Sequence, residues 1–352
     1  MRSLISILSI FFAFSLSACS GTESTVNTES GNGTSPSENI NFAKGADVSW
    51  LTEMEASGVR FYDSDGKPAE CLALLRRLGI NAIRLRVWVD PTDGWNGKED
   101  VIKKAVRAHN LGFRLMIDFH YSDTWADPGK QNIPAAWQTY DLTRMKQAVA
   151  MHTQEVLQAL RDKGVSVEWV QVGNETATGM LWEVGRYSDS NQQNFAQLVT
   201  SGYEAVKKVF PAAKVIVHVD QGDKLGRFTW LFDGLKKQGA KWDVIGMSLY
   251  PEPTTWQQQT NDCLTNIKTL SQRYGCEVMV VEVGMSWDAV QAEAFMRAMS
   301  GGAKNIPQCL GVFYWEPQCY GGWKGYTKGG FDKLGKPTAA FLRFAADKTS
   351  SK

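Results

Sequence analysis

Short apolar runs alternate with helix-like segments along most of the chain. The apolar runs are candidate strands and lie at residues 46–51, 82–89, 114–120, 167–173, 214–219, 244–250, 278–283 and 310–315. Apolar positions recur at helical spacing in residues 68–78, 141–163, 195–210, 264–274, 289–299 and 338–346. Strands that alternate with helices pair in parallel through right-handed crossovers. The pattern therefore predicts an α/β fold made of successive βα units.

The number of candidate strands favours a closed barrel over an open sheet. A (β/α)8 barrel typically takes about 250 residues, which suits a predicted domain at residues 42–349. The alternative is a doubly wound sheet that binds a nucleotide, and a GxGxxG sequence after the first strand would indicate it. No such sequence follows the first candidate strand. We therefore expect a single-domain (β/α)8 TIM barrel.

The amino terminus has the features of a targeting segment. Arg2 precedes an apolar run at residues 4–16, which is too short to span a bilayer. The run closes with LSAC, ending at Cys19, which resembles the lipobox of bacterial lipoproteins. We expect residues 1–19 to be a signal peptide with Cys19 as the lipidated residue; an ordinary secretory signal is the alternative. Residues 20–41 are polar enough to form a flexible tether.

Targeting and charge restrict the partners of this protein. The signal peptide would export the domain, and lipidation at Cys19 would anchor it at the bacterial cell envelope, at the outer membrane or the cell surface. The 38 Lys and Arg residues nearly balance the 37 Asp and Glu residues, for a formal net charge of +1. No basic stripe indicates nucleic acid binding. We expect a neutral substrate, a membrane contact through the lipid only, and a monomer.

The cysteines give no sign of a metal site. Beyond Cys19 the chain has Cys71, Cys263, Cys276, Cys309 and Cys319, an odd number that cannot all pair with one another. No CxxC spacing indicates zinc. The only candidate bridge joins Cys263 and Cys276, but a predicted helix lies between them. We therefore expect mostly buried thiols.

Polar and aromatic residues gather where the predicted strands end. In a barrel of this kind the carboxyl ends of the strands form the catalytic face. The residues in question are Arg84, Arg86, Trp88, Asp118, His120, Asn174, Glu175, His218, Asp220, Tyr250, Glu282 and Trp315. Glu277 begins its strand and is expected at the opposite face. Glu316 is expected to be structural, and His109 and His152 are expected in helices.

Two glutamates suggest a chemistry for this face. Glu175 and Glu282 end the fourth and seventh predicted strands, which lie on opposite sides of a barrel with eight strands. Cleavage of a glycosidic bond uses one carboxylic acid to protonate the leaving oxygen and a second carboxylate to attack or to position water. The distance between them decides between retention and inversion, and both outcomes stay open here. Because Asn174 and Glu175 are adjacent, placing both in the site requires a bulge or twist.

The two glutamates must differ in charge. Arg84 and Arg86 lie two residues apart on one strand, so both are predicted to point inward. Buried guanidinium groups need anionic partners, and Glu282, Asp118 and Asp220 are the candidates. Arginine would keep Glu282 ionised, and the charge of Glu282 would then raise the pKa of Glu175.

Aromatic residues are frequent in the loops beyond the strand ends. They are Trp125, Trp137, Trp182, Tyr187, Trp256, Tyr320, Trp323 and Tyr326. Sugar rings stack their apolar faces on such side chains. We expect about half of these residues to line a groove, which suits internal cleavage of a polysaccharide.

Six motifs occur in order on the predicted strands, namely GADVSW, IRLRVWVDP, DFHYSDTWADP, VGNE, VVEVG and FYWEP. In these motifs the chain resembles the endo-β-1,4-galactanases, family 53 of the glycoside hydrolases. The resemblance runs from about Gly45 to the last predicted helix, and DFHYSDTWADP is its most specific motif. This family belongs to a clan of retaining barrel enzymes whose two glutamates end strands four and seven.

The resemblance implies a function and roles for individual residues. It implies retaining, internal hydrolysis of β-1,4-galactosidic bonds in galactan, or type I arabinogalactan, the side chains of pectin. It implies that Glu175 is the acid/base and Glu282 the nucleophile, with Asn174 binding the 2-hydroxyl. The other residues predicted to bind substrate are Arg84, Arg86, His120, Asp123, Trp125, Asp127, His218, Tyr250 and Trp315.

The chain departs from some bacterial relatives between the seventh and eighth strands. Those relatives carry a long insertion there that helps to bind calcium, whereas only residues 284–308 join the strands here. No Asp-rich loop suits a hard cation. We therefore expect no metal and no cofactor, and the loop at residues 319–335 is a candidate to replace missing sugar sites.

Two other functions stay open. The same chemistry could act on another β-1,4-glycan such as mannan. Alternatively, the barrel could be a catalytically inactive, lipid-anchored protein that binds glycans. The presence of Glu175, Glu282, Asn174 and the two arginines disfavours the inactive protein.

Overall fold

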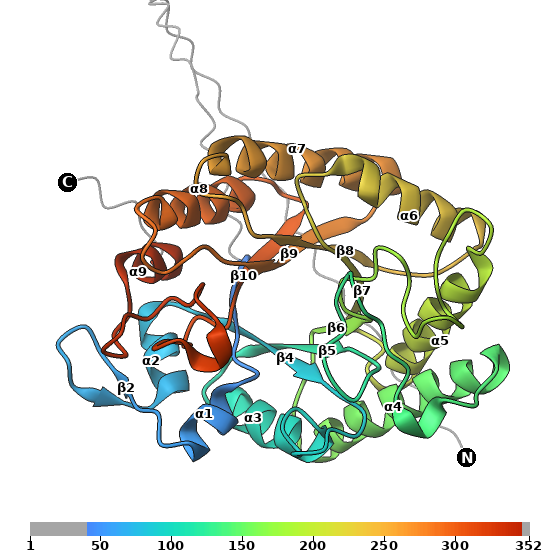
Figure 1. Cartoon of the computed structure of the whole chain (residues 1–352), viewed down its shortest axis with the longest axis horizontal. Helices are drawn as coiled ribbons and strands as arrows, with labels where there is room; N and C mark the ends of the chain where they lie inside the picture. Colours follow the sequence, from blue (N-terminus) through green and yellow to red (C-terminus); the bar gives the residue numbers. More distant parts are fainter. Residues whose placement is uncertain (1–40, 347–352) are drawn as a thin grey trace, which may run out of the picture. The chain divides into compact units, whose positions relative to one another are not determined.

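The computed structural model describes residues 41–346, which form a closed barrel of parallel strands ringed by helices (Figure 1). The strand order around the barrel is β1-β10-β9-β8-β7-β6-β5-β4. Their bounds are β1 (Ala43–Asp47), β4 (Ala82–Val87), β5 (Arg114–Phe119), β6 (Trp169–Val172), β7 (Lys214–Val219), β8 (Val244–Leu249), β9 (Glu277–Val283) and β10 (Cys309–Trp315). The prediction of a single-domain (β/α)8 TIM barrel is confirmed.

Helices connect and cover the strands. They are α1 (Leu51–Ala56), α2 (Cys71–Leu78), α3 (Lys98–Asn110), α4 (Leu142–Asp162), α5 (Gln193–Val209), α6 (Leu225–Lys237), α7 (Trp256–Tyr274), α8 (Ala292–Lys304) and α9 (Ala339–Ala345). Short elements complete the chain: the hairpin of β2 (Phe61–Tyr62) and β3 (Pro68–Ala69), and two single turns, η1 (Ala135–Trp137) and η2 (Trp323–Gly325).

Most predicted elements are found within a few residues of their expected bounds, but the first strand and α7 differ more, and helices α3 and α6 were not predicted. The first strand was predicted at residues 46–51, but it ends at Asp47, and Leu51 already opens α1. Helix α7 begins at Trp256 instead of residue 264 because its first turns are polar and gave no apolar period. Helix α6 was missed because Gly226 and Gly234 lower its helix propensity, although its apolar residues face the barrel.

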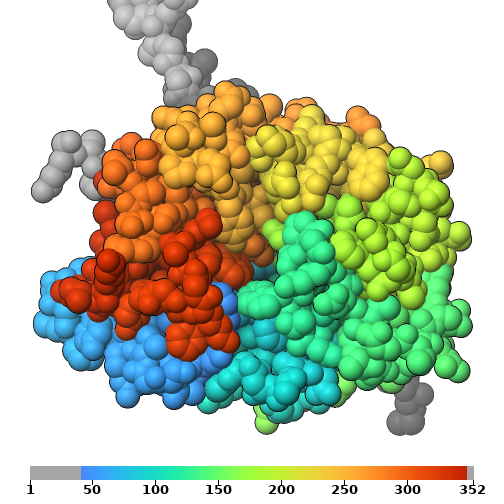
Figure 2. All heavy atoms as spheres, in the orientation of Figure 1, coloured from blue at the N-terminus to red at the C-terminus, as the bar shows by residue number. Residues whose placement is uncertain are grey.

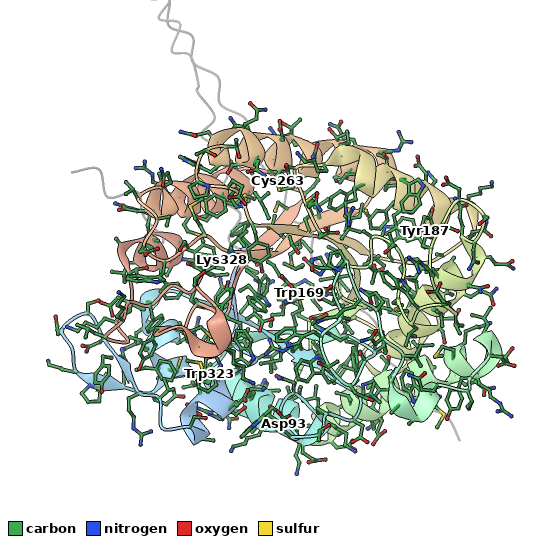
Figure 3. All side chains as sticks on the ribbon, in the orientation of Figure 1. Asp93, Trp169, Tyr187, Cys263, Trp323 and Lys328 are labelled. Atoms are coloured by element: carbon green, nitrogen blue, oxygen red, sulfur yellow. The ribbon has the colours of Figure 1, made fainter. Side chains whose placement is uncertain are left out.

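The amino-terminal half of the barrel interior is filled by an apolar layer. We call this layer the plug; it consists of Ala43, Ala82, Met116, Trp169, Ile216, Val244, Met279, Val281 and Phe313. Trp169 is labelled within the ring of strands in Figure 3. Gly45 leaves room for the plug, since a Cβ there would lie 2.0 Å from Cδ1 of Phe313.

Strand β9 contains an extra residue that matters for the site. Met247 of β8 pairs with Val280, but the next residue, Ser248, pairs with Glu282, so Val281 is skipped. Val281 points into the plug. In a regular strand the following residue would point outward, and the bulge instead turns Glu282 toward the barrel interior.

One group of predictions concerns the ends of the chain. The predicted signal peptide, the lipidation at Cys19 and the tether up to residue 40 lie outside the described residues, as do residues 347–349. Within residues 41–346, no helix has the length and apolar character needed to cross a membrane.

The five cysteines of the described residues are free thiols, and all but Cys276 are buried, as predicted. Cys263 lies inside α7, so the two candidate partners do not bracket that helix.

Candidate active site

A cavity of about 390 Å³ opens at the carboxyl ends of the strands. The surface is hollowed between the red segment that follows β10 and the green segments that follow β5 and β6 (Figure 2). The residues that line the cavity are His120, Trp125, Ala126, Asp127, Asn174, Glu175, Tyr250, Glu282, Trp315, Tyr326 and Lys328. Both predicted catalytic glutamates therefore face the same space.

Glu282 is held by one ion pair and one hydrogen bond. Its Oε1 lies 2.9 Å from Nη2 of Arg84, and its Oε2 accepts a hydrogen bond of 2.7 Å from the hydroxyl of Tyr250. The side chain is almost fully buried, and burial raises the pKa of Glu282 to about 7, although Arg84 and Tyr250 act to lower it. Both contacts favour the ionised form. Glu282 therefore has two partners that favour its ionised form and oppose the effect of burial.

Glu175 has a different environment. After β6 the chain leaves the extended conformation, with φ of +83° at Gly173 and +46° at Glu175, which confirms the predicted irregularity. This turn brings Asn174 and Glu175 to the cavity together. Burial raises the pKa of Glu175 well above its ordinary value, and the charges of Glu282 and Asp220 raise it further. Glu175 is thus the glutamate that holds a proton.

Arg84 organises the polar layer just above the plug. Its guanidinium group donates to Asp47 at 2.7 Å and to Asp118 at 2.8 Å, in addition to its ion pair with Glu282. It also donates to Gln171 and, at 3.0 Å, to Oδ1 of Asn174. Arg84 is only 1% exposed. One buried cation therefore fixes groups from five strands or strand ends, and it lies behind the cavity.

The partners predicted for Arg86 were wrong. Arg86 pairs with Glu316 at 2.6 Å, and Asp220 pairs instead with Arg227 at 2.8 Å. The structural role expected for Glu316 is confirmed, because its fully buried carboxylate also accepts from the backbone N–H of Trp50. A backbone φ of +47° at Glu316 turns that carboxylate into the interior, which simple alternation does not predict.

The Arg86 guanidinium lies beneath aromatic rings. Its Cζ is 4.3 Å from the centroid of Trp125, 5.0 Å from that of Trp50 and 5.5 Å from that of Trp88. Cation–π attraction of this kind fixes the ring of Trp125, which lines the cavity. Arg86 itself does not line it.

His120 is held in one tautomer by its neighbours. Its Nδ1 accepts from the backbone N–H of Ala126 at 3.1 Å and from the indole of Trp88 at 3.3 Å. Nδ1 therefore has no proton, and Nε2 donates to Asp118 at 3.1 Å. The loop that carries Ala126 and Asp127 is fixed to β5 through this ring.

The structure brings most of the predicted substrate-binding residues to the cavity. Those that line it are His120, Trp125, Asp127, Asn174, Tyr250 and Trp315. Arg84, Arg86 and His218 are fully buried behind the lining. Asp123 lies in the same loop as Trp125 and accepts backbone N–H groups of Asp90 and Ala135, so it fixes loop conformation.

Of the eight loop aromatics that were predicted, Trp125 and Tyr326 line the cavity, which is fewer than half. Tyr187 and Trp137 are buried in packing instead. Sequence reasoning missed Ser248, whose hydroxyl donates to Glu175 at 2.8 Å. Its position two residues before Tyr250 on one strand was a signal that could have found it. Nothing in the sequence singled out Lys328.

The structure also shows the positions of the residues that were expected outside the active site. Glu277 pairs with Lys214 at the amino-terminal face of the barrel. His109 and His152 lie in α3 and α4, and His152 packs against Phe119 and Trp137. No group of three potential metal ligands occurs among residues 41–346.

The fold and the cavity define a class of protein. A (β/α)8 barrel that presents two carboxyl groups in different environments, with aromatic rings beside them, has the arrangement of a glycosidase. The model of the family described as glycosyl hydrolase family 53 matches residues 43–294. The chain belongs to this family and is a glycoside hydrolase, and the resemblance found in the sequence is confirmed.

Individual relatives agree with this assignment. An endo-beta-1,4-galactanase of Bacillus subtilis is 32% identical over 79% of this chain and 70% of its own length. An uncharacterized protein of Niallia circulans is 33% identical over 78% of this chain and 83% of its own. Among solved structures, one of two fungal beta-1,4-galactanases has a TM-score of 0.80 and 29% identity, covering 86% of this chain and 98% of that chain.

Proposed function

We propose that the protein is a retaining endo-β-1,4-galactanase that cleaves galactan, or type I arabinogalactan, the side chains of pectin. The family and the activity named for its relatives support the substrate. The observation that carries the mechanism is the unequal environment of the two glutamates in one cavity. Glu282 has a guanidinium and a phenol as partners, whereas Glu175 has negative charges nearby.

The first step forms a covalent intermediate. An oxygen of the Glu282 carboxylate attacks the anomeric carbon while the glycosidic C–O bond breaks, and the proton of Glu175 moves to the leaving oxygen. Arg84 and Tyr250 hold Glu282 in the orientation for attack. In the second step Glu175 removes a proton from water, whose oxygen displaces Glu282 from the anomeric carbon. The β configuration is thereby kept.

Substrate contacts follow from the lining of the cavity. Nδ2 of Asn174 uses one hydrogen for the carbonyl of Ala126 at 2.8 Å and offers the other to the sugar 2-hydroxyl. Trp125, Trp315 and Tyr326 provide aromatic faces for sugar rings. Arg84, Arg86 and His218 act through the residues that they hold. No step requires a metal or a cofactor.

Substitution of each glutamate tests this function. We expect Glu282→Ala and Glu175→Ala to lose most galactan hydrolysis while keeping the thermal unfolding midpoint, and Glu99→Ala, on an exposed part of α3, to keep full activity. Proton NMR of the first product of the unsubstituted enzyme should show the β-anomer. Initial appearance of the α-anomer would mean that the enzyme inverts. Release of reducing ends from mannan but not from galactan would show that mannan is the substrate. Binding of galactan without any release of reducing ends would indicate an inactive binding protein.

We also propose that the enzyme is an exported monomer held at the cell envelope by a lipid on Cys19. The LSAC sequence after an apolar run supports this proposal. Metabolic labelling with a radioactive fatty acid should label the native protein and not Cys19→Ser, which should be recovered in a soluble fraction. Equal labelling of both proteins would contradict lipidation at Cys19. Analytical ultracentrifugation tests whether the enzyme is a monomer.

A further inference from the structure

Ser248 connects the two catalytic glutamates of the proposed function. It lies on β8 directly opposite Glu282 in the register with β9. Its hydroxyl is 2.8 Å from Oε1 of Glu175 and 2.6 Å from Nε2 of His218. Ser248 is 1% exposed and His218 fully buried, so neither side chain exchanges these partners for bulk water.

The direction of these hydrogen bonds depends on the tautomer of His218. The backbone N–H of Glu175 points at Nδ1 of His218 across 3.3 Å. A backbone N–H can only donate, so Nδ1 accepts and is not protonated. A neutral imidazole then carries its proton on Nε2, which donates to Ser248.

Gln171 supports the same tautomer. Arg84 donates to its Oε1 from two nitrogens, which fixes the orientation of the amide group. Nε2 of Gln171 therefore lies 3.0 Å from Nδ1 of His218, and it shares its two hydrogens with Oδ1 of Asp118 at 2.6 Å and Oδ1 of Asn174 at 3.1 Å. An amide nitrogen does not accept a hydrogen bond, so its position disfavours a proton on Nδ1. Oδ1 of Asn174 also lies 3.0 Å from Nδ1, but it accepts hydrogen from Arg84 and from Gln171.

The charge of His218 is consistent with this arrangement. Burial lowers the pKa of His218 well below its ordinary value, and Arg84 and His120 lower it further. The ring is therefore neutral near pH 7. Its Nε2–H occupies one lone pair of Ser248, so the Ser248 hydroxyl hydrogen is directed to Glu175.

We propose that Ser248 and His218 are positioning residues that make Oε2 of Glu175 the proton-transferring oxygen. The hydrogen bonds run in one direction, from Nε2 of His218 to Oγ of Ser248 and from Oγ to Oε1 of Glu175. Because Oε1 always accepts, the proton of Glu175 lies on Oε2. The bond from Ser248 strengthens when Glu175 becomes an anion, which stabilises the state reached after proton transfer. This inference rests on the proposed role of Glu175 as the acid/base.

Substitution of Ser248 by Ala tests the direction of the chain. Loss of a donor to the carboxylate raises the pKa of Glu175, so the alkaline limb of the kcat/KM profile should move to higher pH. The other charges near Glu175, which are Glu282, Asp220 and Arg84, are unchanged by this substitution. We expect kcat on galactan to fall about 10- to 100-fold with little change in KM, because positioning contributes part of the acid/base effect. Ser248→Thr should restore much of the loss, and Ser300→Ala on α8 is the matched control.

A second substrate separates this inference from simple damage to the site. A dinitrophenyl β-galactobioside has a leaving group that needs no proton, so Ser248→Ala should form the covalent intermediate at nearly the rate of the unsubstituted enzyme. An equal loss on both substrates would contradict a role through Glu175. A shift of the alkaline limb to lower pH would mean that Glu175 donates to Ser248, and an unchanged profile would also overturn the proposal. Failure of the unsubstituted enzyme on galactan would instead contradict the proposed function.

Discussion

The two halves of the barrel interior use the same strands for opposite purposes. On β5, Met116 points into the plug, and Asp118, two residues later, accepts from Arg84. The same change occurs on β6 from Trp169 to Gln171 and on β7 from Ile216 to His218. One step of two residues therefore separates a dry apolar layer from a polar layer linked by hydrogen bonds and ion pairs.

The comparison shows where stability and chemistry come from. Each large side chain of the plug contributes about 1.5–3 kcal/mol by leaving water. Charges buried in the polar layer gain little net stability, because desolvation offsets their attraction, and each depends on its partner. The plug stabilises the closed barrel, and the closed barrel keeps Arg84, Glu282 and Glu175 in place.

The largest effect is expected from breaking the polar layer. Arg84→Met removes the one cation shared by Asp47, Asp118 and Glu282. We expect a loss of about 3–5 kcal/mol in unfolding free energy, because buried carboxylates are left unpaired. Activity should fall about 100-fold or more, and the acid limb should move to higher pH as the pKa of Glu282 rises. Denaturant titration measures the unfolding free energy, and the pH profile of kcat/KM measures the activity and the acid limb. A stable, active variant would contradict the role of Arg84.

Breaking the plug should affect stability without changing the chemistry. Met116→Ala leaves a cavity in the apolar layer and should cost about 2–4 kcal/mol of unfolding free energy. At a temperature at which the variant is folded, the limbs of its kcat/KM profile should stay where they are in the unsubstituted enzyme. A shift of either limb would show that the plug influences the charges above it.

A buried histidine outside the barrel interior shows what happens without polar partners. Burial lowers the pKa of His152 on α4 to about 4, and Nε2 of its ring has no hydrogen-bond partner. The unfolded chain binds a proton near pH 6.5, so His152 gives full stability above that pH and loses it as the pH falls toward 4. We expect protonation of His152 to account for a loss of about 2–3 kcal/mol in unfolding free energy. We expect His152→Phe to flatten the dependence of the unfolding free energy on pH in this range, measured by chemical denaturation at several pH values. An unchanged dependence on pH would contradict the prediction.

The smallest effect is expected at the rim of the polar layer. Asp220 raises the pKa of Glu175 through its charge and is itself paired with Arg227. Asp220→Asn should therefore move the alkaline limb of kcat/KM slightly to lower pH, opposite in sign to Ser248→Ala. Salt should weaken the shift because the pair is partly exposed. A move to higher pH would show that the charge of Asp220 does not reach Glu175.

The sequence predicted the fold and the strand-end residues because both depend on local patterns. Apolar runs gave the strands, and motifs at their ends indicated Glu175 and Glu282. The bulge at Val281 could not be predicted, because VVEVG reads as a regular strand and only the pairing with β8 and β10 reveals the extra residue. The pairing of Arg86 with Glu316 was missed because it requires knowing how strands that are distant in sequence meet.

Ser248 illustrates a second limit. Its hydroxyl is small and common, so the sequence gives it no weight until the closed barrel places it between Glu175 and His218. Asn174 and Glu175, by contrast, were located because they end the fourth predicted strand, and strand ends gather at one face of a barrel. Side chains that line the cavity were easier to find than those that hold them.

The central claim is that the polar layer keeps Glu282 ionised as the nucleophile while Glu175 holds the proton. The most direct test is incubation with an activated 2-fluoro-galactobioside, followed by peptic digestion and mass spectrometry of the trapped glycosyl-enzyme. We expect one equivalent of sugar on the peptide that contains Glu282 and none on the peptide that contains Glu175. A label on Glu175, or full turnover of galactan by Glu282→Ala, would contradict the account.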